Sequence, residues 1–337
     1  MDIVIAGSGA SAEFMHGPAL RNTEGCNIVA ICDPEIAHTE EVAKKLGIPR
    51  VFATVREALE HEHADALDVC SIPSRHVEDV LVGLEFGCHV LVEKPVAFNT
   101  DDLERMKEAS KRAGKVLSFV HSQKFLRGPM EAFRKIENEE IGVVCNTYTR
   151  KLFPASGHRM FKHADHWCHK LPGGCWYDAL PHLIYLQYAL VGEMKLRSVS
   201  VRKQGIGYDW IIVDEAVVVL EHSNGFAEFQ LSANGEVKEE SAVVTGSKGM
   251  VVYDFENARA MAGMGDFLCD RQPITSASRS DSCSEPPYGH DRIIQGFVDE
   301  IQNQGTPLIS WDEAYHVVKI SHEIAEAFSS QTRGHIS

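Results

Sequence analysis

The fold of this chain is decided by residues 3–12, which read Ile3-Val4-Ile5-Ala6-Gly7-Ser8-Gly9-Ala10-Ser11-Ala12. A short apolar run ends in a Gly-x-Gly-x-x-Ala turn, and a segment that can form a helix follows it. Glycines at this spacing between a strand and a helix let backbone amides approach a pyrophosphate, whose charge the helix N-terminus stabilises. We therefore expect the turn to bind a dinucleotide through Gly7, Gly9, Ala10, Ser11 and Ala12.

Strand and helix patterns alternate from this turn to about Val120. The helical patterns have readable ends, because Asn99 or Thr100 can cap one helix and Gly114 lies just past its end. The short β-rich apolar runs are Ile3–Ala6, Ile28–Ile31, Leu67–Ser71, His89–Val92 and Val116–Val120. This alternation predicts an α/β fold over residues 1–120, with a doubly wound parallel sheet of the Rossmann type.

Asp33 indicates which nicotinamide cofactor this domain prefers. It ends the second expected strand, 21 positions after Ala12 (33 minus 12), where a carboxylate accepts hydrogen bonds from ribose hydroxyls. A 2′-phosphate would face Asp33 and Glu35 with no adjacent Arg or Lys in the sequence, so NAD is expected over NADP. The alternative is an Asp that only starts a turn before Pro34.

Longer strand-like runs in residues 121–337 predict an α+β domain with a mostly antiparallel open sheet. We expect this domain to bind the substrate and to support oligomers. Asn224-Gly225 supplies a hairpin signal, and Ser310 to Glu313 forms a capping box before a C-terminal helix. The expected strands are Val143–Arg150, Leu196–Lys203, Glu215–Glu221 and Phe226–Ser232. Residues 261–287 are expected to form a long loop.

Composition restricts the partners and the compartment. A formal net charge of −15 argues against nucleic acid and anionic membranes as partners, because both would be repelled. Nine cysteines without a CxxC pair favour free thiols in a reducing cytoplasm. The first residues lack the basic segment of a secretory signal, and no run of about 18 apolar residues is long enough to span a bilayer. A cytoplasmic location is therefore expected.

Glu93-Lys94-Pro95 directly follows the strand at His89–Val92, at the carboxyl edge of the sheet where ligands bind in open α/β folds. A lysine there can meet a nicotinamide ring, and Glu93 can orient that lysine or only pack against the turn. Farther along, Asp178 and His182 have the i, i+4 spacing that puts two side chains on one helical face. The carboxylate could then orient or charge the imidazole.

These motifs together resemble the Gfo/Idh/MocA family, which includes glucose-fructose oxidoreductases and inositol dehydrogenases. The residues that carry the resemblance are the turn at Gly7, His16, Ser71-Ile72-Pro73-Ser74 with His76, Glu93-Lys94-Pro95, Gly173-Gly174 with Asp178 and His182, and, loosely, Lys124-Phe125 with Pro129. Their order and spacing cover nearly the whole chain, which makes the resemblance specific.

The resemblance implies an NAD-dependent oxidoreductase that acts on a secondary alcohol of a sugar, a sugar derivative or a cyclitol. Lys94, Asp178 and His182 would be catalytic, with Lys94 as the first choice for proton transfer and His182 as a competing or cooperating base. Further cofactor contacts would come from Ser71, Ile72, Pro73, His76, Glu93 and Lys94, and substrate contacts from Lys94, His121, His166, Trp167, Asp178 and His182. The resemblance also favours a cis peptide bond before Pro95 and a homodimer or homotetramer.

Two other functions stay open at this point. One is redox-neutral use of NAD, in which a transient oxidation permits elimination or glycoside cleavage. The other is a non-catalytic NAD-binding sensor, against which the presence of Lys94, Asp178 and His182 argues.

Two segments depart from the family's pattern. Pro181 removes a helical donor between Asp178 and His182 and could kink the helix that carries them. The segment His163 to His169 also holds Asp165, His166 and Cys168, a ligand-rich run that lacks an HExxH or CxxC framework. The spacing of three between its histidines could support zinc on a helix, but we expect no metal there. Trp167 resembles the aromatic residue before the family's glycine turn, which favours a substrate-facing wall, that is, a sugar-binding or pH-sensitive loop, over a metal site.

The expected oligomer also follows from the second sheet. Its outer face would expose apolar residues, for which the sequence offers Val217, Val219, Phe226 and Phe229.

Overall fold

The computed structural model describes residues 1–154, 159–203, 208–236, 238–255, 258–262, 289–303 and 305–333. The chain forms two compact units that interleave along the sequence. Unit 1 comprises residues 1–122, 165–185 and 288–330, and unit 2 comprises residues 123–164, 186–287 and 331–337. No helix in the described ranges has both the length and the apolar character that crossing a bilayer needs. The assignment of residues 1–120 to the cofactor and 121–337 to the substrate stays a prediction.

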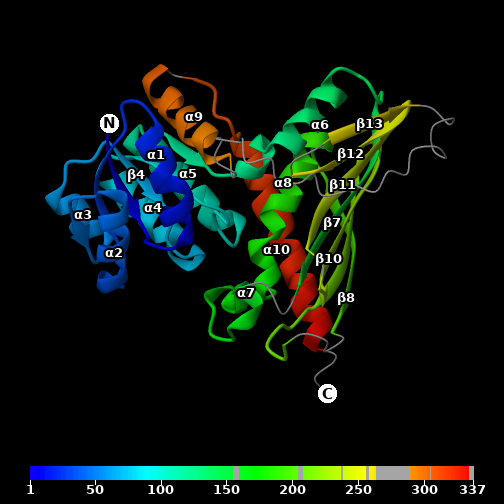
Figure 1. Ribbon diagram of the computed structural model, residues 1–337, viewed down its shortest axis with the longest axis horizontal. Coiled ribbons are helices and arrows are strands. Elements are labelled where there is room, and N and C mark those ends of the chain that lie inside the picture. The colour runs from blue at the N-terminus through cyan, green and yellow to red at the C-terminus, as the bar shows by residue number, and fades with distance from the viewer. Residues whose placement is uncertain are drawn as a thin grey trace. The chain divides into compact units, whose positions relative to one another are not determined.

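Unit 1 contains a parallel sheet of six strands in the order β3-β2-β1-β4-β5-β6. Figure 1 labels strand β4 of this sheet. The strands are β1 (Asp2–Ala6), β2 (Asn27–Cys32), β3 (Val51–Phe52), β4 (Ala66–Val69), β5 (His89–Val92) and β6 (Leu117–Phe119). This is the strand order of a dinucleotide-binding Rossmann fold, so the predicted fold class is confirmed. The carboxyl ends of β1, β2, β4 and β5 meet at one edge of the sheet, where the candidate site lies.

The helices of unit 1 begin and end at the signals in the sequence. Asn99 accepts a hydrogen bond from the Asp102 amide at 2.8 Å and caps α5, which Gly114 ends at φ 63°. Ser310 and Glu313 exchange hydrogen bonds as a capping box at the start of α10. The elements are η1 (Ala12–His16), α1 (Gly17–Asn22), α2 (Ile36–Leu46), α3 (Val55–His61), η2 (Pro73–Arg75), α4 (His76–Glu85), α5 (Thr100–Ala113), η4 (Trp167–Lys170), η5 (Cys175–Asp178), α9 (His290–Asn303) and α10 (Trp311–Arg333).

Unit 2 contains a mixed sheet of seven strands in the order β13-β12-β11-β7-β10-β9-β8. Among the described strands of this second sheet, only β7 and β10 pair in parallel, so the expected mostly antiparallel sheet is confirmed. The strands are β7 (Val144–Pro154), β8 (Lys195–Arg202), β9 (Glu215–His222), β10 (Gly225–Gly235), β11 (Glu239–Gly246), β12 (Gly249–Asp254) and β13 (Ala258–Ala262). Its helices are α6 (Arg127–Glu137) and α7 (Arg159–Lys162). Three elements cross the boundary between the units, namely η3 (Ser122–Phe125), α8 (Leu180–Val191) and, at its last three residues, α10.

The two faces of this second sheet differ in burial. One face forms a core in which Val144, Val244 and Val251 pack with Ala132 of α6. On the other face Tyr148, Val217 and Phe226 are exposed and Val219 is half-buried. Phe229 is completely buried on the core face, so its expected place on the outer face is wrong. The reason is parity, because residues 226 and 229 are an odd number apart and point to opposite faces of a strand.

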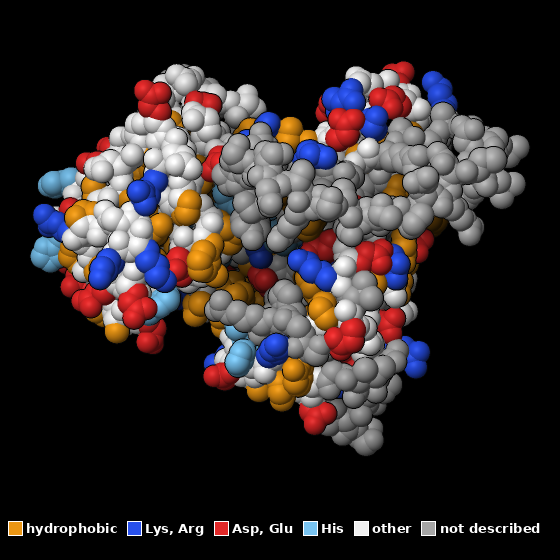
Figure 2. Space-filling model, viewed as in Figure 1, with side chains coloured by type: hydrophobic (Ala, Val, Ile, Leu, Met, Phe, Trp, Pro, Cys, Tyr) orange, Lys and Arg blue, Asp and Glu red, His pale blue; other side chains and the backbone are white. Residues whose placement is uncertain are grey.

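Two further predictions concern loops and thiols. Of the expected loop at residues 261–287, residues 261–262 end strand β13 and the rest lies outside the described residues. The described cysteines are free thiols, which agrees with the predicted absence of disulfides in that part of the chain. On the face drawn in Figure 2, acidic and basic side chains are interspersed over the described surface.

Candidate active site

The glycine-rich turn has the backbone geometry that a pyrophosphate cradle needs. Gly7 adopts φ +97°, and a Cβ there would lie 2.6 Å from the carbonyl oxygen of Cys70, so only glycine fits. A Cβ at Gly9 would meet no described atom within 4 Å beyond its chain neighbours, which leaves this side of the turn open to a ligand. The turn runs directly into η1 at Ala12.

Asp33 lies at the end of β2, beside this turn. Its Oδ2 accepts a hydrogen bond from the Ser8 amide at 3.0 Å, and its Oδ1 accepts one from the Glu35 amide at 3.0 Å. Each oxygen keeps a lone pair for a ribose hydroxyl. A cleft with a volume of about 240 Å³ lies here, and its lining includes Gly7, Asp33, Glu35, Ser71, Ile72, Arg75 and Asp79. The chain's own residues therefore fit a dinucleotide at this edge.

Arg75 corrects one premise of the sequence analysis. No basic residue adjoins Asp33 in the sequence, yet Arg75 lines the same cleft. Its guanidinium lies 3.4 Å from Asp79 Oδ1, and the Ser71 hydroxyl donates to Asp79 Oδ2 at 2.7 Å. Burial raises the pKa of the Asp79 carboxyl, against the opposing effect of these partners. The preference for NAD therefore depends on Arg75 staying with Asp79.

His76 supports the cleft from behind. Its two ring nitrogens lie 2.8 Å from the carbonyl oxygens of Ser71 and Pro95, and the side chain is fully buried. Burial lowers the pKa of this imidazole. His76 therefore joins the cofactor cleft to the turn that carries Lys94, and any direct contact of His76 or the neighbouring Pro73 with a cofactor stays a prediction.

Lys94 and Asp178 form the centre of the candidate site. Lys94 Nζ lies 2.7 Å from Asp178 Oδ1 and 3.1 Å from the Asp178 carbonyl oxygen. The side chains are 14% and 21% exposed, so both remain reachable from outside. Burial alone would lower the pKa of the Lys94 ammonium, but the Asp178 and Glu93 carboxylates outweigh it and raise that pKa. The Lys94–Pro95 peptide bond is cis, as the resemblance implied.

Asp178 and His182 do not share one α-helix, contrary to the geometry assumed from their spacing. Asp178 ends η5, whereas His182 lies in the first turn of α8, which begins at Leu180. The cause is Pro181, because proline is tolerated in the first turn of a helix, where its missing N–H is not needed. Gly173 precedes this segment at φ +69°, where a Cβ would lie 3.0 Å from Cα of Ala325 on α10.

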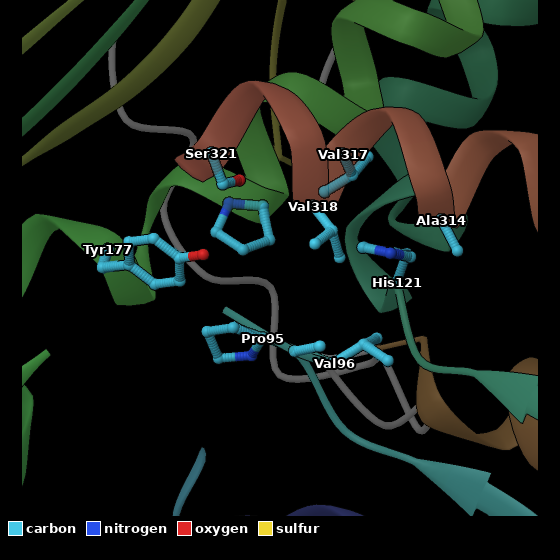
Figure 3. A pocket seen from close by; sticks show the side chains of 10 residues that line it. Pro95, Val96, His121, Tyr177, Ala314, Val317, Val318 and Ser321 are labelled. Carbon is cyan, nitrogen blue, oxygen red and sulfur yellow. The ribbon is translucent and has the colours of Figure 1, made fainter. Parts of the chain in front are cut away.

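His121 lies in a small pocket beside the Lys94–Pro95 turn (Figure 3). Pro95 and Val96 lie opposite Val317, Val318 and Ser321 of α10, with Tyr177 at one end. The imidazole is 1% exposed and stacks on Tyr185 at 4.3 Å between ring centroids. Neither ring nitrogen reaches a described hydrogen-bond partner, and burial lowers the pKa of His121 to about 3. Contact with a substrate stays a prediction for this residue.

The histidine-rich segment spans an element boundary. His163 is exposed, while His166 is half-buried and caps η4, its Nδ1 accepting from the Cys168 amide at 3.4 Å. Its ring lies 5.2 Å from that of Trp167. The groups of described side chains spaced to hold a metal ion do not include this segment. They are His16 with Asp68 and Cys70, and His16 with Glu93 and His290.

The second of these groups is a buried hydrogen-bonded cluster behind Lys94. His16 Nδ1 lies 2.8 Å from Asp68 Oδ2, and His16 Nε2 lies 3.0 Å from Glu93 Oε1. His290 Nε2 lies 3.3 Å from the same Glu93 oxygen. The other Glu93 oxygen, Oε2, accepts a hydrogen bond from the Lys94 amide at 2.8 Å.

Sequence reasoning missed Asp68, Arg75 and His290. Asp68 carried a readable signal, since a carboxylate in the middle of the apolar run at residues 66–69 needs a buried partner. His290 carried none, because 197 positions separate it from Glu93.

Comparison with known proteins identifies the family of this chain. Residues 1–121 match the model of the Gfo/Idh/MocA oxidoreductase family for its NAD-binding Rossmann fold, and residues 134–335 match the family's C-terminal α/β domain. The chain therefore belongs to this NAD-binding oxidoreductase family, and the resemblance seen in the sequence is confirmed.

Individual relatives match over shorter stretches. A D-glucoside 3-dehydrogenase of Escherichia coli K12 is 28% identical over 150 residues, which are 44% of this chain and 43% of that protein. A myo-inositol 2-dehydrogenase of Thermotoga maritima is 30% identical over 128 residues, 38% of each chain. The chain thus spans less than half the length of these two curated relatives.

The likeness in fold extends further than the likeness in sequence. An oxidoreductase from Agrobacterium radiobacter, solved in complex with NAD⁺, L-tartaric acid and magnesium, superposes with a TM-score of 0.79 at 15% identity. The match covers 99% of this chain and 96% of that one. At this identity the match establishes the fold alone.

Proposed function

We propose that this protein is an NAD-dependent dehydrogenase that oxidises a secondary alcohol of a sugar, a sugar derivative or a cyclitol, or reduces the corresponding ketone. The observation that carries the proposal is the Lys94–Asp178 pair, 2.7 Å apart at the carboxyl edge of the cofactor-binding sheet. The named activities of the glucoside and inositol dehydrogenases among its relatives support the substrate class.

In this proposal Lys94 acts as a cation. The carboxylates around it raise the pKa of its ammonium, so it is protonated at neutral pH. An ammonium beside a substrate oxygen stabilises the negative charge that develops there in either direction of the reaction, while the proton itself moves to and from His182. Asp178 holds the ammonium in one position through a charge-assisted hydrogen bond.

His182 is the proposed acceptor of the hydroxyl proton during oxidation. A lysine that stays protonated is a poor base, whereas a neutral imidazole accepts a proton near pH 7. His182 follows Asp178 by four residues and is half-buried in the first turn of α8. This assignment gives the two residues complementary roles.

NAD bound in the cleft would supply the two-electron acceptor for this reaction. The chain holds it through the amides of the turn at Gly7 and Gly9, while Asp33 binds the ribose hydroxyls. His76 links that cleft to the Lys94 turn through two main-chain carbonyls. The cytoplasmic location also stays a proposal, supported by the free thiols among the described cysteines.

The test is to assay the purified protein for bound NAD and then to challenge it with a panel of sugars, glycosides and inositols. Substrate-dependent reduction of NAD supports the dehydrogenase. Conversion of a glycoside without net NADH would instead support redox-neutral chemistry, and tight NAD binding without any turnover would support a sensor.

A further inference from the structure

His16 is a fully enclosed titratable group of unit 1 that the proposed chemistry leaves unused. Its side chain is 0% exposed and lies at the end of η1, directly after the glycine-rich turn. The groups that face it are Asp68 on β4, Cys70 just after β4, Glu93 just after β5, and the His290 ring on α9, whose centroid lies 4.9 Å away.

The protons of this cluster can be counted from its hydrogen bonds. Oxygens of Asp68 and Glu93 lie 2.8 and 3.0 Å from the Nδ1 and Nε2 atoms of His16. With both carboxylates ionised, neither offers a proton, so both ring nitrogens donate. His16 is then an imidazolium between two carboxylates. Burial opposes this charge, but Asp68 and Cys70 raise the pKa of His16 well above its usual value.

Glu93 transmits this arrangement to Lys94. Its Oε1 is fixed by His16 and His290, and its Oε2 receives the Lys94 amide at 2.8 Å. Three contacts therefore fix the Glu93 carboxylate, from His16 of η1, from the Lys94 amide just after β5, and from His290 of α9. The main chain of Lys94 is thereby fixed to the element that follows the cofactor turn.

We propose that His16 is a positioning residue, which holds the Glu93 carboxylate and through it the main chain of Lys94 in the geometry that the chemical step requires. The inference rests on the proposed function, because it assigns Lys94 to that step. A small displacement of a catalytic group reduces turnover strongly without changing which ligands bind. The cluster therefore couples the cofactor turn to the catalytic lysine.

Two substitutions separate the two hydrogen bonds of His16. The amide of asparagine falls near the position of Nδ1 and that of glutamine near Nε2, so His16→Asn keeps the Asp68 contact and His16→Gln keeps the Glu93 contact. Both variants lose the positive charge equally. We expect His16→Asn to reduce kcat about 10²-fold with little change in KM, and His16→Gln to stay within about tenfold of wild type.

A matched control is His89→Asn. His89 begins β5, the strand that ends directly before Glu93. His89 Nδ1 accepts from the Val116 amide at 3.1 Å, which asparagine can reproduce, so kcat should not change. Equal losses of kcat in His16→Asn and His16→Gln would overturn the proposal, since charge or folding alone would then explain them. A wild-type kcat in His16→Asn would also overturn it.

Nuclear magnetic resonance of the ¹⁵N-labelled full chain tests the network without any substrate. We expect both His16 ring nitrogens to be protonated at pH 7, and the Lys94 amide signal to move in His16→Asn but not in His16→Gln. A singly protonated His16, or stoichiometric zinc in the wild type that His16→Asn loses, would overturn the assignment. If the spectra are as expected but the protein oxidises no sugar, the hydrogen-bonded cluster around His16 is supported and the proposed function is contradicted.

Discussion

Lys94 Nζ lies 2.7 Å from Asp178 Oδ1 and 3.1 Å from the carbonyl oxygen of the same residue. One residue of the chain thus holds the ammonium through both its side chain and its main chain. The position of that ammonium depends on where η5 ends, and the charge of Asp178 keeps it protonated. A single substitution at Asp178 should therefore change the ionisation of Lys94.

The first prediction concerns pH dependence. The pKa of Lys94 is raised, so its ammonium persists to high pH and is lost as pH rises through that pKa. Asp178→Asn removes the raising charge while burial continues to lower the pKa. We expect the basic limb of kcat for ketone reduction to move to lower pH. Glu193→Gln, a substitution at an exposed residue, serves as the control. If the fall of kcat at high pH occurs at the same pH in Asp178→Asn as in wild type, Asp178 does not control the ionisation of Lys94.

The second prediction concerns the choice of nicotinamide cofactor. Wild type should bind NAD more tightly than NADP, because Asp33 repels a 2′-phosphate. Asp33→Ser removes that charge, and the Kd for NADP should fall by about tenfold or more. Since Arg75 lines the same cleft, Asp33→Ser with Arg75→Met should lose this gain. Titration by fluorescence measures both nucleotides on all three proteins, and equal affinities of wild type for NAD and NADP would refute the role of Asp33.

The third prediction concerns stability in acid. His121 has a folded-state pKa of about 3 against about 6.5 in an unfolded chain, so its stabilising contribution is present above pH 6.5 and is lost as pH falls toward 3. His121→Gln should therefore show a smaller drop in Tm between pH 7 and pH 5. The exposed His63→Gln should match wild type. An unchanged drop in His121→Gln would show that other groups govern acid unfolding.

Much of the fold could be predicted because its signals are local. The Gly-x-Gly turn, the Asn99 cap and the Ser310 capping box each involve residues that lie within a few positions of one another. Strand β3 has only two residues, too short for a pattern to appear. Strands β11 and β12 join through Ser247-Lys248, which carries no hairpin signal of the Asn-Gly kind.

The candidate site was only partly predictable for the opposite reason. Lys94 and Asp178 came from motifs, but their contact joins residues 84 positions apart. The i, i+4 rule failed at Asp178 because Pro181 favours a helix start. The buried cluster around His16 gathers elements that only the sheet order and α9 bring together, so nothing near His16 in the sequence indicates His290.

The fourth prediction concerns assembly. Tyr148, Val217 and Phe226 are exposed on the outer face of the second sheet, and a second copy of the chain that covers this face would bury them. We expect a homo-oligomer by light scattering, and Phe226→Glu should shift it toward monomer. Phe86→Glu, exposed at the end of α4, should not. A monomeric wild type at working concentrations would contradict this interface.

The most direct test of the account is the rate of hydride transfer in a single turnover, measured for Lys94→Met and His182→Asn with saturating substrate. Methionine keeps a stem of similar length but removes the charge and the donor, so the chemical step should slow by roughly 10²- to 10⁴-fold while NAD affinity changes little. His182→Asn should also slow oxidation, because it removes the proton acceptor. Single-turnover conditions prevent product release from masking either effect. A rate near that of wild type for Lys94→Met would contradict the account, because Lys94 would then have no part in the chemical step.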